Sequence, residues 1–150
     1  METSYMTLEE INEMWAKDAK MDETNLGSEA LKIPQLHNKY YMFYSKEALR
    51  LRKCKAELKE LEFAKYEYYI GTMTEEDLKE RGWKPNPLKI LRTDVNKYIE
   101  CDKDIINLSL KIDYHMQMAN YLEDIIKQIN SRNFMIKSAI DWVKFQAGGF

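Results

Sequence analysis

Two long segments without helix-breaking residues constrain the fold more than any other feature of the chain. No glycine or proline lies between Pro34 and Gly71, or from Leu88 to Ala147. In both segments apolar residues recur every three or four positions, which is the spacing of one face of an α-helix. Proline is accepted in the first turn of a helix and glycine just after its last turn. The sequence therefore predicts an all-α fold of long helices with coiled-coil-like periodicity.

The chain divides into three parts on this pattern. Residues 1–71 combine a short acidic helix with a long basic helix, which is the expected DNA-binding part. The first helix begins with the sequence of a capping box, with Thr7 as the N-cap and Glu10 three residues later. Residues 72–87 contain two prolines close together and are expected to be a linker. Residues 88–150 are expected to form one long C-terminal helix that oligomerises.

The C-terminal segment carries the longest apolar stripe of the chain. A chain of 150 residues has little else against which to bury a stripe of this length, so self-association is the simplest solution. Asn130-Ser131-Arg132-Asn133 is a place where this helix can bend or break. The residues expected to oligomerise are Ile112, Leu122, Ile126, Ile129, Ile136, Ile140 and Val143.

Several functional classes do not fit the sequence. No apolar run reaches the length of a membrane span, and the N-terminus lacks the pattern of a signal peptide, so a cytoplasmic protein is expected. Cys54 and Cys101 are isolated and are expected to be free thiols. The chain contains no phosphate-binding loop, dinucleotide-binding, zinc-protease or serine-hydrolase motif. Its two histidines lie on apolar stripes, and its neighbouring carboxylates, such as Asp102 and Asp104, are interpreted as solvated or capping charges. We therefore expect no catalytic residue, metal site or cofactor.

The charges are distributed unevenly along the chain. Residues 1–30 hold two Lys against eight Asp and Glu, whereas residues 31–70 hold nine Lys and Arg against five Glu. Basic residues on one helical face bind phosphate groups, and nearby aromatic rings can stack on the bases of a single strand. A basic helical face is also often merely solvated, so both interpretations stay open. The candidate nucleic-acid-binding residues are Arg52, Lys53, Lys55, Lys59, Phe63, Lys65 and Tyr68.

Lys65 differs from the other candidates because it falls on the apolar stripe of the second helix. A lysine at such a position costs stability unless its ammonium group reaches solvent or a ligand. The side chain can extend to solvent near the end of the helix, or it can line a groove of an oligomer. The sequence does not decide between these two alternatives.

Three stretches of the chain resemble one known family. The segment from Phe63 to Gly71, FAKYEYYIG, resembles the KAR-LDYY-SG element of the UvsY family, the recombination mediators of T-even-like phages. Cys101-Asp102-Lys103-Asp104-Ile105 is similar to the ADKDV element of that family, at the same distance from the last motif. That motif, from Ile129 to Lys137 and followed by Phe145-Gln146-Ala147-Gly148, resembles the family's IKSRGFAIK…FEAG ending.

The resemblance implies a non-enzymatic mediator that binds single-stranded DNA as a ring-like oligomer of six or seven subunits. It also implies two protein partners, the phage single-strand-binding protein and the phage strand-exchange recombinase, in the cytoplasm of the infected host cell. The mediator would destabilise the first protein on DNA and load a filament of the second, for homologous recombination and repair. Lys65 matches a basic position that the family uses on DNA, whereas the other basic position of that element is Phe63 here.

A second hypothesis, from a different class, is a helical structural or adaptor oligomer without a nucleic-acid role. The two hypotheses share a fold and differ in one observable property. Only the mediator should bind single-stranded DNA with an affinity that falls steeply as the salt concentration rises.

Overall fold

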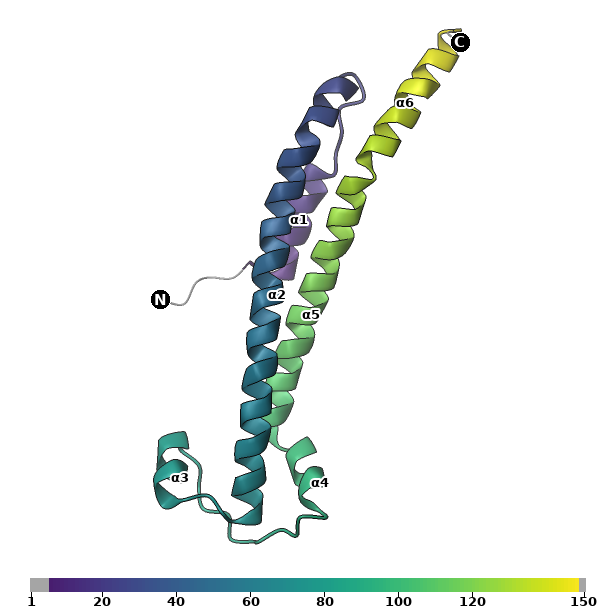
Figure 1. Ribbon diagram of the computed structural model, residues 1–150. Coiled ribbons are helices and arrows are strands. Elements are labelled where there is room, and N and C mark those ends of the chain that lie inside the picture. The colour runs from purple at the N-terminus through teal and green to yellow at the C-terminus, as the bar shows by residue number, and fades with distance from the viewer. Residues whose placement is uncertain (1–5, 149–150) are drawn as a thin grey trace. The chain divides into compact units, whose positions relative to one another are not determined.

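The computed structural model describes residues 6–148 and contains helices but no strand in this range (Figure 1). The all-α prediction is therefore confirmed. None of the helices within the described range is long and apolar enough to span a membrane. In chain order the helices are α1 (Leu8–Asp18), α2 (Leu26–Ile70), α3 (Glu75–Arg81), α4 (Val95–Glu100), α5 (Lys103–Asn130) and α6 (Arg132–Gln146).

The first helix begins as its sequence predicts. The Thr7 hydroxyl accepts a hydrogen bond from the Glu10 amide at 3.2 Å, and the Glu10 carboxylate accepts one from the Thr7 amide at 3.0 Å. This reciprocal pair satisfies two backbone donors that the first turn would otherwise leave free. The capping-box prediction is confirmed.

The long second helix begins earlier than its proline suggests. Helix α2 starts at Leu26, and Pro34 lies inside it. The helix ends at Ile70, and Gly71 follows in the left-handed conformation with a φ of 81°. Glycine is favoured there because it has no Cβ atom to oppose a positive φ.

The segment 88–150 does not form one uninterrupted helix. The irregular connection continues to Asp94, and the helical remainder is divided into α4, α5 and α6. No glycine or proline causes the division between α4 and α5. Asp102 causes it instead, because its carboxylate accepts the amide hydrogens of Asp104 and Ile105 and so caps the start of α5. The junction between α5 and α6 falls at Ser131, within the predicted stretch.

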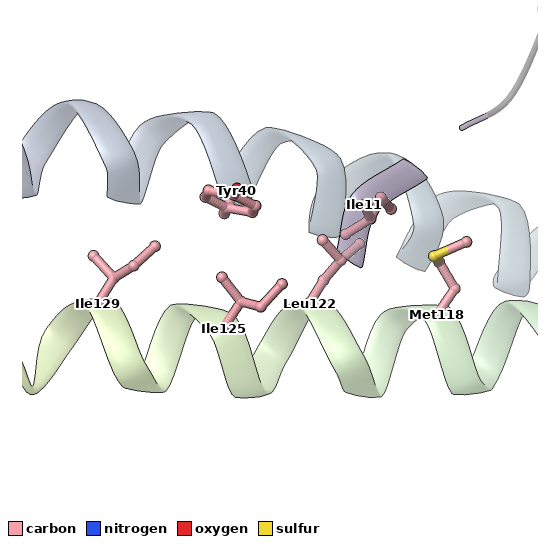
Figure 2. Close-up of a cluster of buried hydrophobic side chains, with 6 residues drawn as sticks. All are labelled: Ile11, Tyr40, Met118, Leu122, Ile125 and Ile129. Carbon is pink, nitrogen blue, oxygen red and sulfur yellow. The ribbon is translucent and has the colours of Figure 1, made fainter. Parts of the chain in front are cut away.

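The chain forms two compact units, and α2 and α5 each contribute one part to both. The first unit contains residues 6–47 and 117–148 of the described chain. Its core joins α1, α2 and α5 through six buried side chains, each of which contributes about 1.5–3 kcal/mol by leaving water (Figure 2). The six residues are Ile11, Tyr40, Met118, Leu122, Ile125 and Ile129.

A buried arginine lies beside this core. Arg132, the first residue of α6, is 2 % exposed and donates a hydrogen bond to the carbonyl oxygen of Asp18. Asp18 is the last residue of α1, so the guanidinium group satisfies a carbonyl at the end of that helix. The Asp18 carboxylate accepts hydrogen bonds from Lys39 at 2.6 Å and from the Tyr40 hydroxyl at 2.8 Å. The first unit is thus held by a polar cluster as well as by its apolar core.

The second unit contains residues 48–116. It consists of the second part of α2, the connection that carries α3, then α4, and the first part of α5. Helices α3 and α4 lie on opposite sides of the C-terminal end of α2 (Figure 1). Its buried apolar residues include Cys54, Ala64, Val95, Ile105 and Ile112.

Candidate nucleic-acid interface

Four of the predicted cations form an exposed group on α2, which we call the α2 basic run: Arg52, Lys53, Lys55 and Lys59. The helical spacing of three and four residues places Arg52, Lys55 and Lys59 on one face. Phe63 follows Lys59 by one turn, and its ring is 64 % exposed. This part of α2 therefore presents to solvent two kinds of side chain that bind single strands: cations, which contact phosphates, and an aromatic ring, on which a base can stack.

Lys65 lies in a different environment. Its side chain is almost entirely buried, and its ammonium nitrogen lies 3.1 Å from an Asp102 carboxylate oxygen and 2.9 Å from one of Asp104. The same nitrogen lies 3.9 Å from the centre of the Trp83 ring, which is a cation–π distance. Lys65 thus meets two carboxylates and an indole instead of solvent.

Asp102 connects this lysine to the start of α5. One carboxylate oxygen receives the Lys65 ammonium and the Tyr69 hydroxyl, the latter at 2.5 Å, while the other caps α5. Burial raises the pKa of Asp102, but the hydrogen bonds from Tyr69 and Lys65 lower it more, so the pKa lies below its ordinary value. Burial is the largest cause that raises the pKa of the Tyr69 hydroxyl, and its hydrogen bond to Asp102 raises that pKa further. Asp102 is therefore not the solvated charge that its sequence context suggests.

The linker contributes the remaining wall of this site. Trp83 contacts the Tyr68 ring edge-on at a centroid distance of 5.4 Å, and the Tyr68 hydroxyl donates to the carbonyl oxygen of Lys84 at 2.7 Å. The sequence carried no local signal that Trp83 would cover Lys65, since the two lie on separate elements. We call Lys65, Tyr69, Trp83, Asp102 and Asp104 the Lys65 cluster.

The predicted site residues therefore fall into two groups. The α2 basic run and Phe63 are exposed, whereas Lys65 and Tyr68 belong to or border the Lys65 cluster. In the described part of the chain, no three His, Cys, Asp or Glu side chains are placed to hold a metal ion. Cys54 and Cys101 are both free thiols, as expected.

The residues expected to oligomerise also divide by exposure. Ile112, Leu122, Ile129 and Ile136 are buried within the chain itself, and Ile126 is half-buried against the core of the first unit. Ile140 and Val143 on α6 are exposed. Further large apolar side chains accompany them on α6, and the rings of two of these are stacked at a centroid distance of 5.7 Å. The exposed apolar residues of α6, which we call the α6 apolar group, are Phe134, Met135, Ile140, Trp142, Val143 and Phe145.

Comparison with known proteins identifies the family. Residues 14–149 match the family model described as "Recombination, repair and ssDNA binding protein UvsY". The recombination protein uvsY of Enterobacteria phage T4 is 24 % identical over 143 residues, which cover 95 % of this chain and 99 % of that protein.

Solved structures agree in fold. A crystal structure of the bacteriophage T4 recombination mediator protein UvsY superposes with a TM-score of 0.80 at 24 % identity, covering 95 % of this chain and 98 % of that one. A second crystal lattice of the same protein gives a TM-score of 0.77 at 23 % identity, covering 94 % and 99 %. The family match extends over nearly the whole chain and includes the α2 basic run, the Lys65 cluster and α6. The chain is therefore a member of the UvsY family of recombination, repair and single-stranded-DNA-binding proteins.

Proposed function

We propose that this protein is a recombination mediator that binds single-stranded DNA as a ring-like homo-oligomer of six or seven subunits. It destabilises the phage single-strand-binding protein on DNA and loads the phage strand-exchange recombinase, in the cytoplasm of the infected host cell. It performs no chemistry itself. The observation that carries the proposal is the exposed α2 basic run, in a chain that belongs to a single-strand-binding family.

The basic run supplies the electrostatic part of binding. Each cation that meets a phosphate releases a condensed counterion, so affinity depends on salt and not on sequence. Phe63 adds a ring on which a base can stack, where the corresponding family element has a cation. Lys65 can contact a phosphate only when it leaves its carboxylate partners. We therefore assign the phosphate contacts mainly to the exposed cations, and a secondary role to Lys65.

Oligomerisation supports binding through multivalency. A ring presents several copies of the basic run to one strand, which raises avidity without any new contact. The α6 apolar group is the surface for this association, because its side chains remain exposed in the single chain. The family match favours this mediator over a structural adaptor without a nucleic-acid role.

Fluorescence anisotropy of a labelled thymine-only strand tests the proposal. The logarithm of the affinity should fall with the logarithm of the salt concentration, with a slope of about −0.7 for each neutralised phosphate. The variant Arg52→Ala/Lys55→Ala/Lys59→Ala should bind more weakly and with a shallower slope. The matched control Lys103→Ala/Lys111→Ala/Lys127→Ala, which removes three exposed cations from α5, should bind like the wild type. A wild-type protein that does not bind at low salt would overturn the proposal.

The mediator step needs a separate assay. Strand exchange by the recombinase on DNA coated with single-strand-binding protein should begin sooner when the wild type is present. The triple variant should lose this stimulation in proportion to its weaker DNA binding. Stimulation that survives when DNA binding is abolished would move the function to protein–protein interactions alone.

A further inference from the structure

The connection between α2 and α4 is a second strongly basic segment, which the predicted DNA site does not include. Residues 79–92 hold five Lys and Arg against one Glu, so this segment carries a net charge of +4. All five cations are exposed: Lys79, Arg81, Lys84, Lys89 and Arg92. Within the described residues, none of these five has a carboxylate at ion-pair distance. The cations are therefore available to an external anion.

A hollow of about 170 Å³ is lined by residues of this connection and of the C-terminal end of α2. The ring of Tyr68 forms part of its wall, and Gly71 and Pro85 on its rim are exposed. The other lining residues are Met73, Leu78 and Asn86. An aromatic ring with apolar neighbours is the kind of surface on which a nucleobase stacks.

Two of the cations lie next to residues that line the hollow. Lys84 precedes Pro85, and its carbonyl oxygen accepts the hydrogen bond from the Tyr68 hydroxyl. The side chain of Lys89 lies against Gly71, so closely that a Cβ atom built there would lie 3.3 Å from the Lys89 Cγ atom. Cations beside an aromatic hollow form the combination that binds the backbone and a base of a single strand together.

The segment is also held in a defined conformation. The Ile90 amide donates to the Tyr69 carbonyl oxygen at 3.1 Å, and Trp83 is fixed against Lys65 on α2. A surface fixed in this way loses little conformational freedom when a ligand binds. The carboxylates nearest in sequence are Glu80, between Lys79 and Arg81, and Asp94, two residues after Arg92, and among the described residues neither lies at ion-pair distance from a cation of the segment.

We propose that residues 79–92 form a second binding site for single-stranded DNA, with phosphates on Lys84 and Lys89 and a base in the hollow beside Tyr68. This site rests on the proposed single-strand function and extends the path of the strand beyond the α2 basic run. Single-stranded DNA is favoured over an acidic polypeptide because the hollow offers a stacking surface, which a run of carboxylates would not use.

Charge removal tests the site. The full-length variant Lys84→Ala/Lys89→Ala should bind a thymine-only strand more weakly, and its salt slope should be shallower by about 0.7 for each phosphate that it no longer neutralises. The charge-conserving variant Lys84→Arg/Lys89→Arg should keep the wild-type slope, and Lys103→Ala/Lys111→Ala is the control for an equal loss of charge elsewhere. Equal melting temperatures for all four proteins would show that the fold is unchanged.

Crosslinking supplies the second readout. A strand that carries 4-thiothymidine should crosslink, on irradiation, to a tryptic peptide from residues 79–92. Wild-type affinity and slope in Lys84→Ala/Lys89→Ala, together with no crosslink to this peptide, would overturn the second site but leave the α2 site standing. Loss of poly-glutamate binding in that variant with unchanged strand binding would also overturn it, because the segment would then bind acidic polypeptides. A wild type without strand binding would remove both proposals.

Discussion

The Lys65 ammonium nitrogen lies 3.1 Å from the Asp102 carboxylate, and the two side chains are only 6 % and 7 % exposed. Removing two charges from water is costly, and their attraction compensates only when further hydrogen bonds satisfy both groups. Here Tyr69 and two backbone amides complete the partners of Asp102, and Trp83 covers the lysine. The pair therefore fixes the end of α2 to the start of α5 within the second unit.

Removal of one partner should destabilise the protein strongly. We expect Asp102→Ala to lower the free energy of unfolding by about 3 kcal/mol, because it leaves the buried ammonium group with only the half-exposed Asp104 carboxylate and also removes the cap of α5. Asp104→Ala should cost less than about 1 kcal/mol, since that carboxylate is 54 % exposed. Urea denaturation measures both values. The double variant Lys65→Met/Asp102→Asn should be destabilised by less than the sum of its two single variants, and additive effects would contradict the coupling.

The same pair should make stability sensitive to acid. The pKa of Asp102 is lower in the folded protein than in the unfolded chain, so its contribution is complete above the unfolded value of about 3.9. The contribution is lost as the pH falls through the folded pKa. Urea denaturation between pH 6 and pH 3 should therefore show a steeper loss of stability below about pH 4 in the wild type than in Asp102→Asn. Parallel curves for the two proteins would show that other carboxylates account for the acid dependence.

Arg132 should be important for stability although it lies in a sequence motif of a DNA-binding family. We expect Arg132→Met to cost about 3 kcal/mol, because the Asp18 carbonyl oxygen loses its donor and the buried Glu29 carboxylate keeps only Lys32 as a cationic partner. Arg132→Lys should not restore the wild-type value, since an ammonium group cannot reproduce the planar donor geometry of a guanidinium. Thermal unfolding measures these effects, and the exposed Lys144→Ala serves as the control. DNA affinity per folded molecule should remain unchanged in Arg132→Met.

Point substitutions in the α6 apolar group should separate assembly from folding. We expect Trp142→Ser/Val143→Ser/Phe145→Ser to lower the mass measured by sedimentation while the circular dichroism spectrum stays helical. Truncation before Arg132 is less informative, because it also deletes a buried residue of the first unit. Leu122→Ala, by contrast, should cost about 2–5 kcal/mol by leaving a cavity in that core. A triple variant that still sediments at the wild-type mass would exclude the α6 apolar group as the interface.

Local features of the structure could be predicted from the sequence. The capping box at Thr7, the end of α2 before Gly71 and the interruption near Ser131 depend on residues only a few positions apart. Turns and caps are decided by neighbours, so one sequence is enough to predict them. The exposure of Lys55 and Lys59 followed from helical spacing in the same way.

The Lys65 cluster could not be predicted, because its members lie far apart in the chain. The sequence left open whether Lys65 reaches solvent or a groove, and the structure gives a third arrangement, a buried ion pair with Asp102. The break between α4 and α5 was missed for a different reason. The partners of Asp102 are local, the amides of Asp104 and Ile105, but the apolar spacing continues past this residue and so predicts an uninterrupted helix.

The pairing of Lys65 with Asp102 also determines where the second unit can tolerate a change in chain length. One residue inserted in α2 between Ala56 and Lys65 would turn every later side chain by about 100° around the helix axis, and so move the ammonium group away from its carboxylate. An insertion between Leu91 and Asp94 lies outside the helices, so it leaves the side chains of α2 and α5 in register and disrupts the turn closed by the Asp94 amide and the Leu91 carbonyl oxygen. Doubling the length of a loop adds only about 0.6 kcal/mol to its closure cost. Insertions should therefore be accepted between Leu91 and Asp94 and rejected in α2 between Ala56 and Lys65.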